Sequence, residues 1–562
     1  MKDIKQRINH EWLLLVSVFL LALFFRFFQI TKVPLSLNWD EATFGYNAYS
    51  ILKTGADEYG QKFPLSFKSI GDYKCPLYIY LMVPIIKLFG LNEFSVRFLP
   101  SFLGALTVPL LFMIVKELFK DKKIAFISSL ILAISPWHLQ FTRAGADVAV
   151  SSFFLILGIW LFLKSVNSAQ KRFLFYSLSV ISFVLTFYAY YGERFFTPLM
   201  CLVLIWIYRE QVLKTKKEFL KSVLLGVIAF LPLAGSLISS GHQGKILMTT
   251  VLGYQPSLEY LAQMRKEDKN QIIFNIFHND FVGKGIAIIS HYLNHFSPSF
   301  LFINGPQDNR QRIEGMGMLY FSDIILLLLG FWLFVTNRQK KGYFLVLCWL
   351  AVAPLPAAIT RDLVHARRSF NMIYPLSIIM ALGLVFLIEK IKSIKNRFFK
   401  IFISAVLLIF FFWSFVFYLL SYYIFTPLRT YKGPGGWQYG YKELVEFVSP
   451  LKSKYNQVIV DTFYQGPYAF FLFYEKYPPE NYQKQAVLVK ENDWSLGEGK
   501  GYDNYLFRKT FWPNDRGTKN ILFAGPPESI PKRDIDPRQA RLLKIIYFPD
   551  GTEAFYIVET TP

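Results

Sequence analysis

Long apolar stretches recur along the first three-quarters of this chain, and no other feature constrains its fold as strongly. A helix needs about 20 predominantly apolar residues to cross the hydrocarbon core of a bilayer. Of the 562 residues, 53% are hydrophobic and 18% aromatic, which exceeds the usual content of a soluble domain. We therefore predict a polytopic α-helical membrane protein.

The apolar stretches predict about eleven spans when each is matched to the thickness of a bilayer. We expect them near residues 12–30, 97–115, 124–137, 147–163, 173–190, 195–208, 221–240, 318–336, 343–360, 370–388 and 400–424.

Basic residues lie in short clusters between the apolar stretches, so the formal net charge of +22 needs no nucleic-acid partner. Cytoplasmic loops of membrane proteins are enriched in Lys and Arg. With eleven spans, the N-terminus and all the basic loops fall on one side; these loops are 116–123, 164–172, 209–221, 337–341 and 389–400. The first span lacks a small-residue cleavage site, so we expect it to be retained. The pattern predicts a multi-pass plasma-membrane protein, bacterial by composition, with a cytoplasmic N-terminus.

The stretch from Pro76 to Gly90 is too short for a span, and counting it would reverse every later loop against the charge rule. We expect it to lie along the outer membrane surface as an interfacial helix. The long outward loops are then 31–96 and 241–317, and long ordered loops are often functional.

The chain divides into a membrane domain at 1–424 and a tail at 425–562, where Lys432 to Gly436 form a Gly/Pro linker. A helical stretch and several strand-like runs follow the linker, which predicts a small extracytoplasmic α/β domain. The helix is expected at Tyr441–Phe447 and the strands at Gln457–Phe463, Gln485–Val489, Asn520–Phe523, Leu542–Phe548 and Ala554–Val558.

Just outside the first span, Asp40 and Glu41 lead into a helical stretch from Ala42 to Leu52. Adjacent carboxylates lie about 100° apart on a helix, so only one of them can face a given pocket. The structural alternative is favourable charge at a helix N-terminus, with Asp40 as the cap and Glu41 in the first turn.

Lys74 follows in the same loop, two residues before Pro76. A lysine at the membrane surface can meet a lipid phosphate as a compact point charge, or it can be a simple interfacial anchor. Further outward cations could bind an anionic headgroup; they are Arg143, Arg194, Arg361, His365, Arg367 and Arg368. Three potential cations between 365 and 368 oppose the charge rule, which favours an anionic partner there.

Other charged residues leave alternatives open. Asp147 and Arg143 are four residues apart, a spacing that allows them to pair; the alternative is that Asp147 orders an acceptor or a divalent ion. Arg26, near the outer end of the first span, is explained by snorkelling. In the large loop, His291 and His295 have a spacing that permits a metal, but loop histidines are more often plain surface residues, so we assign no metal site; His278 and Asp280 lie nearby. The three widely spaced cysteines show neither a disulfide framework nor a metal-ligand pattern.

Several of these residues together resemble the GT-C glycosyltransferases of family 39, which include protein O-mannosyltransferases and lipid A aminoarabinose transferases. The resemblance covers residues 12 to about 390 and rests on Asp40-Glu41, Lys74-Cys75-Pro76-Leu77, Phe89-Gly90, Ser95-Val96-Arg97-Phe98-Leu99-Pro100, Ser135-Pro136-Trp137-His138 with Arg143 and Asp147, and the Arg361–Phe370 loop. This sequence departs from the pattern at Cys75, where proline commonly follows the lysine.

The resemblance implies an inverting transfer from a polyprenyl-phosphate-sugar donor to a hydroxyl or phosphate of a glycan, lipid or protein acceptor outside the cytoplasm. Asp40 matches the aspartate taken as general base, Glu41 matches the acidic residue beside it, and Lys74 matches a lysine that contacts the lipid phosphate. No cofactor is required, although a divalent cation is possible. The matched residues end before the linker, so we expect the tail domain to be dispensable for the donor.

A lipid flippase or secondary transporter is the alternative function. Transporters tend to show duplicated halves and ionisable residues near the membrane midplane. This sequence shows no such repeat, and its charges gather at the outer ends of spans. The pattern favours an interfacial reaction over a translocation path.

Overall fold

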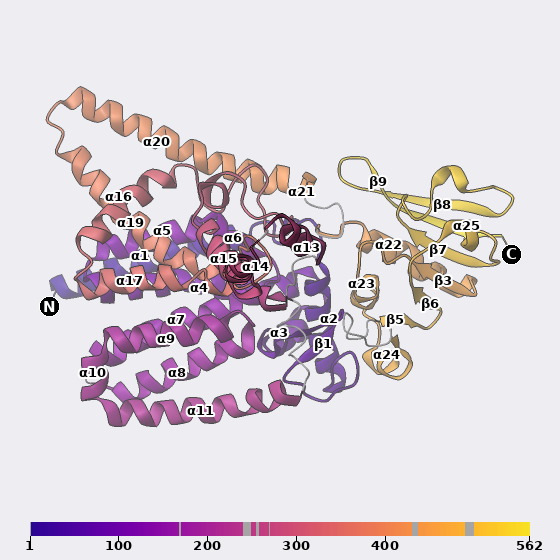
Figure 1. The fold of residues 1–562 in the computed structure, drawn as a ribbon, viewed down its shortest axis with the longest axis horizontal. Helices are drawn as coiled ribbons and strands as arrows, with labels where there is room; N and C mark the ends of the chain where they lie inside the picture. Colours follow the sequence, from indigo (N-terminus) through magenta and orange to yellow (C-terminus); the bar gives the residue numbers. More distant parts are fainter. Residues whose placement is uncertain are drawn as a thin grey trace.

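A bundle of membrane-length helices makes up most of the molecule, and a separate sheet domain lies beyond one end of it (Figure 1). The computed structural model describes residues 2–167, 170–239, 249–253, 258–268, 270–429, 436–488 and 499–561. The predicted linker at 432–435, Val489 and parts of the loop 241–317 lie outside these residues.

The bundle helices run side by side, with the N-terminus at the end away from the sheet domain (Figure 1). They are α1 (Lys2–Phe27), α4 (Glu93–Phe119), α5 (Lys122–Ile134), α6 (Pro136–Arg143), α7 (Asp147–Asn167), α8 (Arg172–Ala189), α9 (Glu193–Ile207), α10 (Arg209–Lys214), α11 (Lys216–Ser239), α16 (Asp323–Thr336), α17 (Lys341–Val352), α18 (Leu355–Ala358), α19 (Ile373–Lys392), α20 (Arg397–Leu420) and α21 (Thr426–Arg429). We call the end of the bundle nearer the sheet domain the domain end.

Seven helical segments of the described chain are long and apolar enough to cross a membrane, and a bent pair makes an eighth. Helices α1, α9 and α16 coincide with predicted spans outside this set. The polytopic α-helical fold is confirmed, and the number eleven stays a prediction.

The predicted span at 124–137 coincides with a bent pair of helices, and whether the pair crosses the bilayer stays a prediction. Helix α5 ends at Ile134, and α6 starts at Pro136 with a bend of 55°. Proline has no backbone N–H and disfavours helical geometry in the residue before it, so the break falls at Ser135. The bend directs α6, which carries His138 and Arg143, across the bundle interior, where both residues are fully buried.

A small subdomain at the domain end is formed by residues 31–92. Its elements are α2 (Trp39–Thr54), the hairpin of β1 (Phe67–Ser69) and β2 (Asp72–Lys74), and α3 (Pro76–Phe89). Helix α3 matches the predicted short helix; its orientation in a bilayer stays a prediction. A second segment outside the bundle contains α13 (Leu258–Glu267), α14 (Gln271–Phe277) and α15 (Asp280–Asn294).

The C-terminal domain is a seven-stranded sheet with the order β4-β5-β6-β3-β7-β9-β8. Strand β3 pairs in parallel with β6 and β7, and the other pairings are antiparallel. The elements are α22 (Tyr441–Val448), β3 (Gln457–Val460), α23 (Pro467–Tyr474), α24 (Pro479–Gln485), β4 (Val487–Leu488), β5 (Gly499–Tyr502), β6 (Tyr505–Phe507), α25 (Trp512–Asp515), β7 (Ile521–Gly525), β8 (Ala540–Tyr547) and β9 (Glu553–Thr560).

The predicted α/β domain is confirmed, with two corrections to its strands. The run Gln457–Phe463 leaves the sheet after Val460, and Gln485 ends helix α24 instead of starting a strand. Strands β5 and β6 were not predicted, because Gly499–Tyr502 and Tyr505–Phe507 are too short to show an alternating pattern.

The C-terminal domain and the first subdomain share one hydrophobic core. Residue Gly45 of α2 lies against Phe473 of α23, and the Tyr46 hydroxyl donates a hydrogen bond of 3.1 Å to the carbonyl of Tyr477. The backbone N–H of Trp39 donates to Gln438 Oε1 at 2.9 Å. The expectation that the tail is dispensable for the donor is therefore at odds with the packing, because removing the tail would uncover α2.

Candidate active site

Helix α2 lies at the domain end of the bundle (Figure 1) and carries Asp40 in its first turn. The Asn38 side chain accepts from the backbone N–H of Glu41 at 3.1 Å, and the Glu41 carboxylate accepts from the backbone N–H of Asn38 at 3.0 Å. This reciprocal capping box fixes the start of the helix. The predicted helix is confirmed, but its cap is Asn38 and not Asp40.

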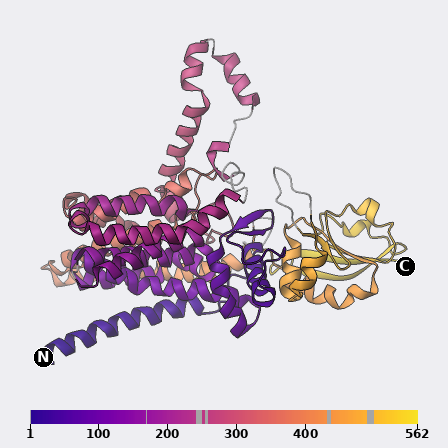
Figure 2. The same ribbon diagram turned by 90° about the horizontal axis from the view of Figure 1, so that it is seen from below.

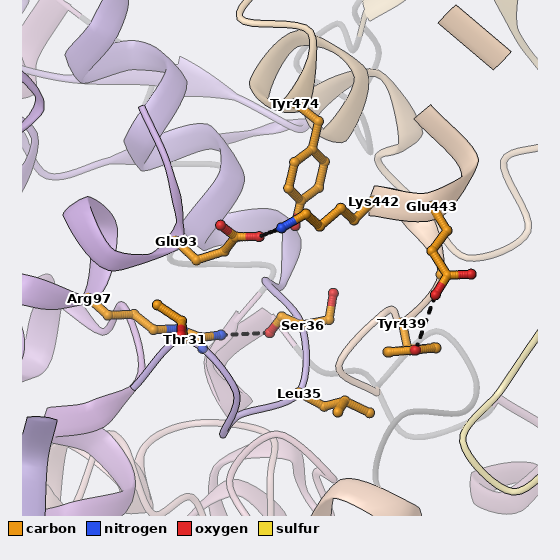
Figure 3. A pocket seen from close by; sticks show the side chains of 10 residues that line it. Thr31, Leu35, Ser36, Glu93, Arg97, Tyr439, Lys442, Glu443 and Tyr474 are labelled. Carbon is orange, nitrogen blue, oxygen red and sulfur yellow. Dashed lines mark hydrogen bonds and ion pairs between the residues drawn. The ribbon is translucent and has the colours of Figure 1, made fainter. Parts of the chain in front are cut away.

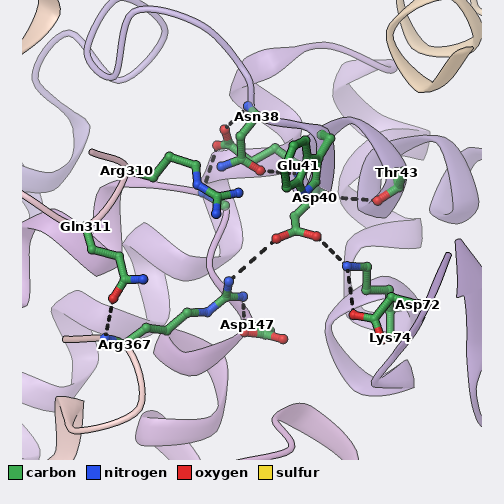
Figure 4. A network of polar contacts seen from close by, with 12 residues as sticks. Asn38, Asp40, Glu41, Thr43, Asp72, Lys74, Asp147, Arg310, Gln311 and Arg367 are labelled. Atoms are coloured by element: carbon green, nitrogen blue, oxygen red, sulfur yellow. Dashed lines mark hydrogen bonds and ion pairs between the residues drawn. The ribbon is translucent and has the colours of Figure 1, made fainter. Parts of the chain in front are cut away.

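The Asp40 carboxylate lies between two cations that come from distant parts of the chain (Figure 4). One oxygen pairs with the ammonium of Lys74, at the end of β2, and the other lies 3.7 Å from the guanidinium of Arg367. The Asp40 side chain is 16% exposed and that of Arg367 is 23% exposed. Solvent can reach this pair.

Each of the two cations has a second acidic partner. Asp72 lies 3.5 Å from Lys74, and Asp147, at the start of α7, pairs with Arg367 at 2.5 Å. We call these five residues the charge chain: Asp72, Lys74, Asp40, Arg367 and Asp147. Of the two alternatives for Asp147, pairing with Arg143 is excluded, because Asp147 pairs with Arg367.

The charge chain keeps Asp40 ionised. Burial alone would raise the pKa of this carboxyl, but Lys74, Arg367 and Arg310 outweigh it and hold the pKa well below its usual range. Burial alone would lower the pKa of the Lys74 ammonium. The carboxylates of Asp40 and Asp72 outweigh burial and raise this pKa above its usual value. In this state the carboxylate holds no proton and the ammonium keeps its charge.

Glu41 faces away from the charge chain and is fully buried. Its carboxylate accepts from Arg97 at 2.8 Å and from the backbone N–H of Gly145 at 2.8 Å, besides capping α2. Arg97 also donates to carbonyl groups of the segment after α1, including those of Ile30 and Pro34. The Glu41–Arg97 pair therefore ties α2 to α4 and to the end of the first span.

Arg143 lies in the bundle interior, where backbone carbonyls occupy its guanidinium. It donates to the carbonyls of Phe25, Arg26, Phe28 and Val33 and contacts the Tyr422 hydroxyl. Arg26 does not snorkel as predicted: it is fully buried and contacts the ring nitrogen of His138 at 2.6 Å. These contacts give both arginines a structural position, away from the charge chain.

The other predicted cations differ in their surroundings. Arg194, at the start of α9, stacks on Tyr191 and reaches Cys75 Sγ at 3.7 Å, next to Lys74 in sequence. Arg368 pairs with exposed Asp362 at 2.9 Å, beside Arg367. Burial and the neighbouring arginines lower the pKa of His365 well below its usual value, which disfavours a third cation in this loop.

Arg310 is a site residue that sequence reasoning missed. Its guanidinium lies 4.8 Å from the centre of the Trp39 ring, and its charge acts on Asp40. The neighbouring Gln311 accepts a hydrogen bond of 3.1 Å from the backbone N–H of Arg367. Arginines 310 and 312 stand in a predicted outward loop against the charge rule, and that signal could have found them.

No group of three or more His, Cys, Asp or Glu side chains in the described residues is arranged to hold a metal ion. The ring of His295 is buried and its Nδ1 contacts the carbonyl of His291 at 2.7 Å, so these two histidines do not face a common site.

A cavity of about 130 Å³ lies where the first subdomain and the start of α4 meet the C-terminal domain, and no residue of the charge chain lines it (Figure 3). Its charged side chains are engaged: Glu93 pairs with Lys442 at 3.0 Å, and Arg97 donates to the carbonyl of Ser36 at 2.7 Å. The volume holds a few water molecules. We assign this cavity to the docking of the C-terminal domain.

Comparison with known proteins agrees with this fold. Residues 73–235 match the family of dolichyl-phosphate-mannose-protein mannosyltransferases (PMT_2), which is well under half of the chain. The matched region contains Lys74, Arg143, Asp147 and Arg194, but not Asp40 or Arg367. No curated protein sequence matches the chain.

Two solved proteins share the architecture over nearly the whole chain. The oligosaccharyltransferase AglB from Archaeoglobus fulgidus, in complex with an inhibitory peptide and a dolichol-phosphate, is 13% identical with a TM-score of 0.53, covering 98% of this chain and 74% of AglB. ArnT from Cupriavidus metallidurans in the apo state is 10% identical with a TM-score of 0.53, covering 99% and 98%. ArnT bound to undecaprenyl phosphate is 11% identical with a TM-score of 0.50 and coverage of 98% of each chain. At this identity the likeness shows the fold alone, and it confirms the predicted resemblance.

Proposed function

We propose that this polytopic membrane protein with the GT-C fold is a glycosyltransferase that moves a sugar from a polyprenyl-phosphate donor to an acceptor hydroxyl or phosphate. The reaction inverts the anomeric carbon and takes place at the domain end of the bundle, outside the cytoplasm. The acceptor is a glycan, a lipid or a protein, and the membrane lipids surround the spans.

The placement of Asp40 between Lys74 and Arg367 carries this proposal. The reaction needs a base for the acceptor and positive charge for the leaving phosphate. An ionised carboxylate beside two cations at the domain end of the bundle supplies both. The resemblance to polyprenyl-phosphate-dependent enzymes supports a lipid-phosphate leaving group, as do the dolichol-phosphate bound to AglB and the undecaprenyl phosphate bound to ArnT.

Donor binding and base activation are then coupled. The lipid phosphate competes with Asp40 for Lys74 and Arg367, each charge-assisted contact being worth about 1.5–3 kcal/mol. As these cations turn to the phosphate, the pKa of Asp40 rises and the carboxylate becomes a better base. The donor-free protein, with Asp40 strongly paired, stays unreactive toward an acceptor.

In the transfer itself, the acceptor oxygen attacks the anomeric carbon and its proton passes to the Asp40 carboxylate. The bond from that carbon to the phosphate oxygen breaks, and polyprenyl phosphate leaves with the electron pair. Lys74 and Arg367, with Arg194 and Arg368 nearby, stabilise the charge that develops on the phosphate. Asp147 orients Arg367. A divalent cation is a further possible participant.

Glu41 and Arg143 have positioning roles in this proposal. Glu41 fixes the first turn of α2 through Arg97, and Arg143 holds the end of the first span, so both set the place of Asp40 without touching the substrate. We assign Glu41 to holding the start of α2 and not to the acceptor.

The test is transfer or hydrolysis of a radiolabelled polyprenyl-phosphate sugar by the purified full-length protein, with Asp40→Asn as the variant. Asparagine keeps the size of the side chain but cannot accept the proton, so turnover should fall by about 10²–10⁴-fold while donor binding persists. The matched control is Asp536→Asn, which removes a carboxylate that pairs with exposed Arg538 in the C-terminal domain and should keep the turnover.

Near-wild-type turnover in Asp40→Asn would place the base elsewhere, with Asp147 the next candidate. Unchanged donor, together with uptake of the intact lipid-linked sugar across vesicles, would instead support the alternative function of a flippase or transporter.

A further inference from the structure

The segment from α13 to α15 stands out from the bundle as a helical hairpin, crosswise to the spanning helices (Figure 2). It leaves the body at the domain end. Its base is tied to the end of a spanning helix: the Tyr292 hydroxyl donates to the carbonyl of Ala351 at 2.9 Å, and the His291 ring contacts the carbonyl of Ala358 at 3.3 Å. The hairpin therefore extends sideways at the level where the spans end.

Helix α15 has two chemically distinct sides. At 100° per residue, Phe281, Ile286, Ile289 and Leu293 fall on one side and form what we call the apolar stripe. Polar residues fall opposite, among them Asp280 and Lys284, which pair with each other. A helix with this division lies at a boundary between an apolar and an aqueous medium.

The apolar stripe has no protein partner among the described residues. Phe281 is 87% exposed, the other three stripe residues are each at least 60% exposed, and no residue of α15 is fully buried. The preceding helix continues the pattern with exposed Ile272 and Ile276. Large exposed apolar surfaces of this kind mark sites of contact with another protein or a membrane.

We propose that the hairpin lies on the membrane surface at the domain end, with the apolar stripe inserted at the boundary between headgroups and acyl chains. In a chain that spans a bilayer, a helix that projects sideways at the ends of the spans has that surface beside it. In-plane amphipathic helices bury their apolar face about 5–10 Å into this boundary. The occupant is thus lipid, and the inference depends neither on the sugar nor on the side of the membrane.

The test uses the full-length protein with Cys75, Cys201 and Cys348 replaced by serine, reconstituted in vesicles of phosphatidylcholine and phosphatidylglycerol. A single cysteine at Ile289 or, as the matched control, at Asp280 carries an environment-sensitive fluorophore. The two side chains are similarly exposed but lie on opposite sides of α15. Quenching is compared between a nitroxide-labelled lipid and aqueous iodide.

The proposal expects the probe at 289 to be quenched several-fold more by the lipid nitroxide than the probe at 280, with the reverse order for iodide. Equal access of iodide to both probes would overturn it. A probe at 289 shielded from both quenchers, in a manner that grows with protein density, would assign the stripe to a second copy and also overturn it. A probe at Arg538, in the C-terminal domain, reports water access in the same vesicles, and a monodisperse elution profile shows that each variant is folded.

Discussion

Asp40 owes its ionisation state to cations that are not adjacent to it in sequence. Lys74 lies in the same loop, whereas Arg367 comes from the loop before α19. The carboxylate is therefore sensitive to any change in either partner, including one made by a substrate.

The first consequence concerns the pH dependence of turnover in Lys74→Met. Removing this cation raises the pKa of Asp40, because an opposite charge lowers the pKa of a neighbouring carboxyl by about 1–3 units. The proposed reaction requires ionised Asp40, so the acidic limb of the kcat/KM profile should move to higher pH by a similar amount. The control Lys442→Met removes a cation paired with Glu93 and should leave the limb in place. An unmoved limb in Lys74→Met would separate Asp40 from the proton transfer.

The second consequence concerns Gly145, whose N–H donates to Glu41. A Cβ built there would lie 2.6 Å from Glu41 Cγ, closer than real Cβ contacts come. Gly145→Ala should therefore displace Glu41 and disturb the start of α2, lowering kcat with little change in the affinity for the donor. Gly235→Ala is the control, because that position has open space. Unaltered turnover in Gly145→Ala would show that the contact between Gly145 and Glu41 is not needed for the reaction.

Elements of the first subdomain and of the C-terminal domain depend on one another. Gly45 illustrates this at the contact of α2 with α23, where a Cβ would lie 2.6 Å from the Phe473 ring and 2.8 Å from Val96. Helix α2 can approach α23 this closely because position 45 has no side chain. The Asp40 carboxylate thus stands on a helix that the C-terminal domain helps to hold.

Glu58 adds a titratable group to this contact. It is fully buried, lies 3.3 Å from the Tyr468 hydroxyl of α23, and has its pKa raised to about 8 by burial, with a further contribution from Asp57. The folded state holds a proton that the unfolded chain releases near pH 4.5, so stability falls as the pH rises from about 4.5 to about 8.

Glu58→Gln should remove this dependence and raise the midpoint of thermal unfolding at pH 8 by a few degrees, with little effect at pH 5. Intrinsic fluorescence of the purified protein measures both midpoints. The control Glu443→Gln changes an acid of α22 outside this contact. Parallel pH dependence in wild type and Glu58→Gln would show that Glu58 is ionised in the folded protein.

For the whole molecule, the sequence predicted the class of the fold and its division into bundle and sheet domain, because apolar length and alternation are local properties. It also placed Asp40, Lys74 and Arg367 among the candidates. It did not predict that Asp147 joins Arg367 or that Arg143 binds backbone carbonyls. Such pairings depend on how α6 bends after Ser135, which brings together residues more than 100 positions apart.

The sidedness of the molecule follows from the charge rule and is open to direct measurement. Single cysteines at Lys395, in the turn between α19 and α20, and at Arg538, in the C-terminal domain, should react with an impermeant maleimide from opposite sides of sealed vesicles. Both positions are exposed. The N-terminal side is expected to share the accessibility of Lys395. Labelling of both positions from one side would contradict the predicted topology.

The shared core also determines when the molecule becomes complete during its synthesis. Tyr468 is 410 residues downstream of Glu58, which it contacts. At translation rates of about 5–20 residues per second, the first subdomain waits about 20–80 s for its partner. During that interval α2 has no α23 to pack on, so the newly made chain needs another cover for this surface. A chain that stops short never acquires that partner, and it is left with an exposed apolar face that quality-control proteases can recognise.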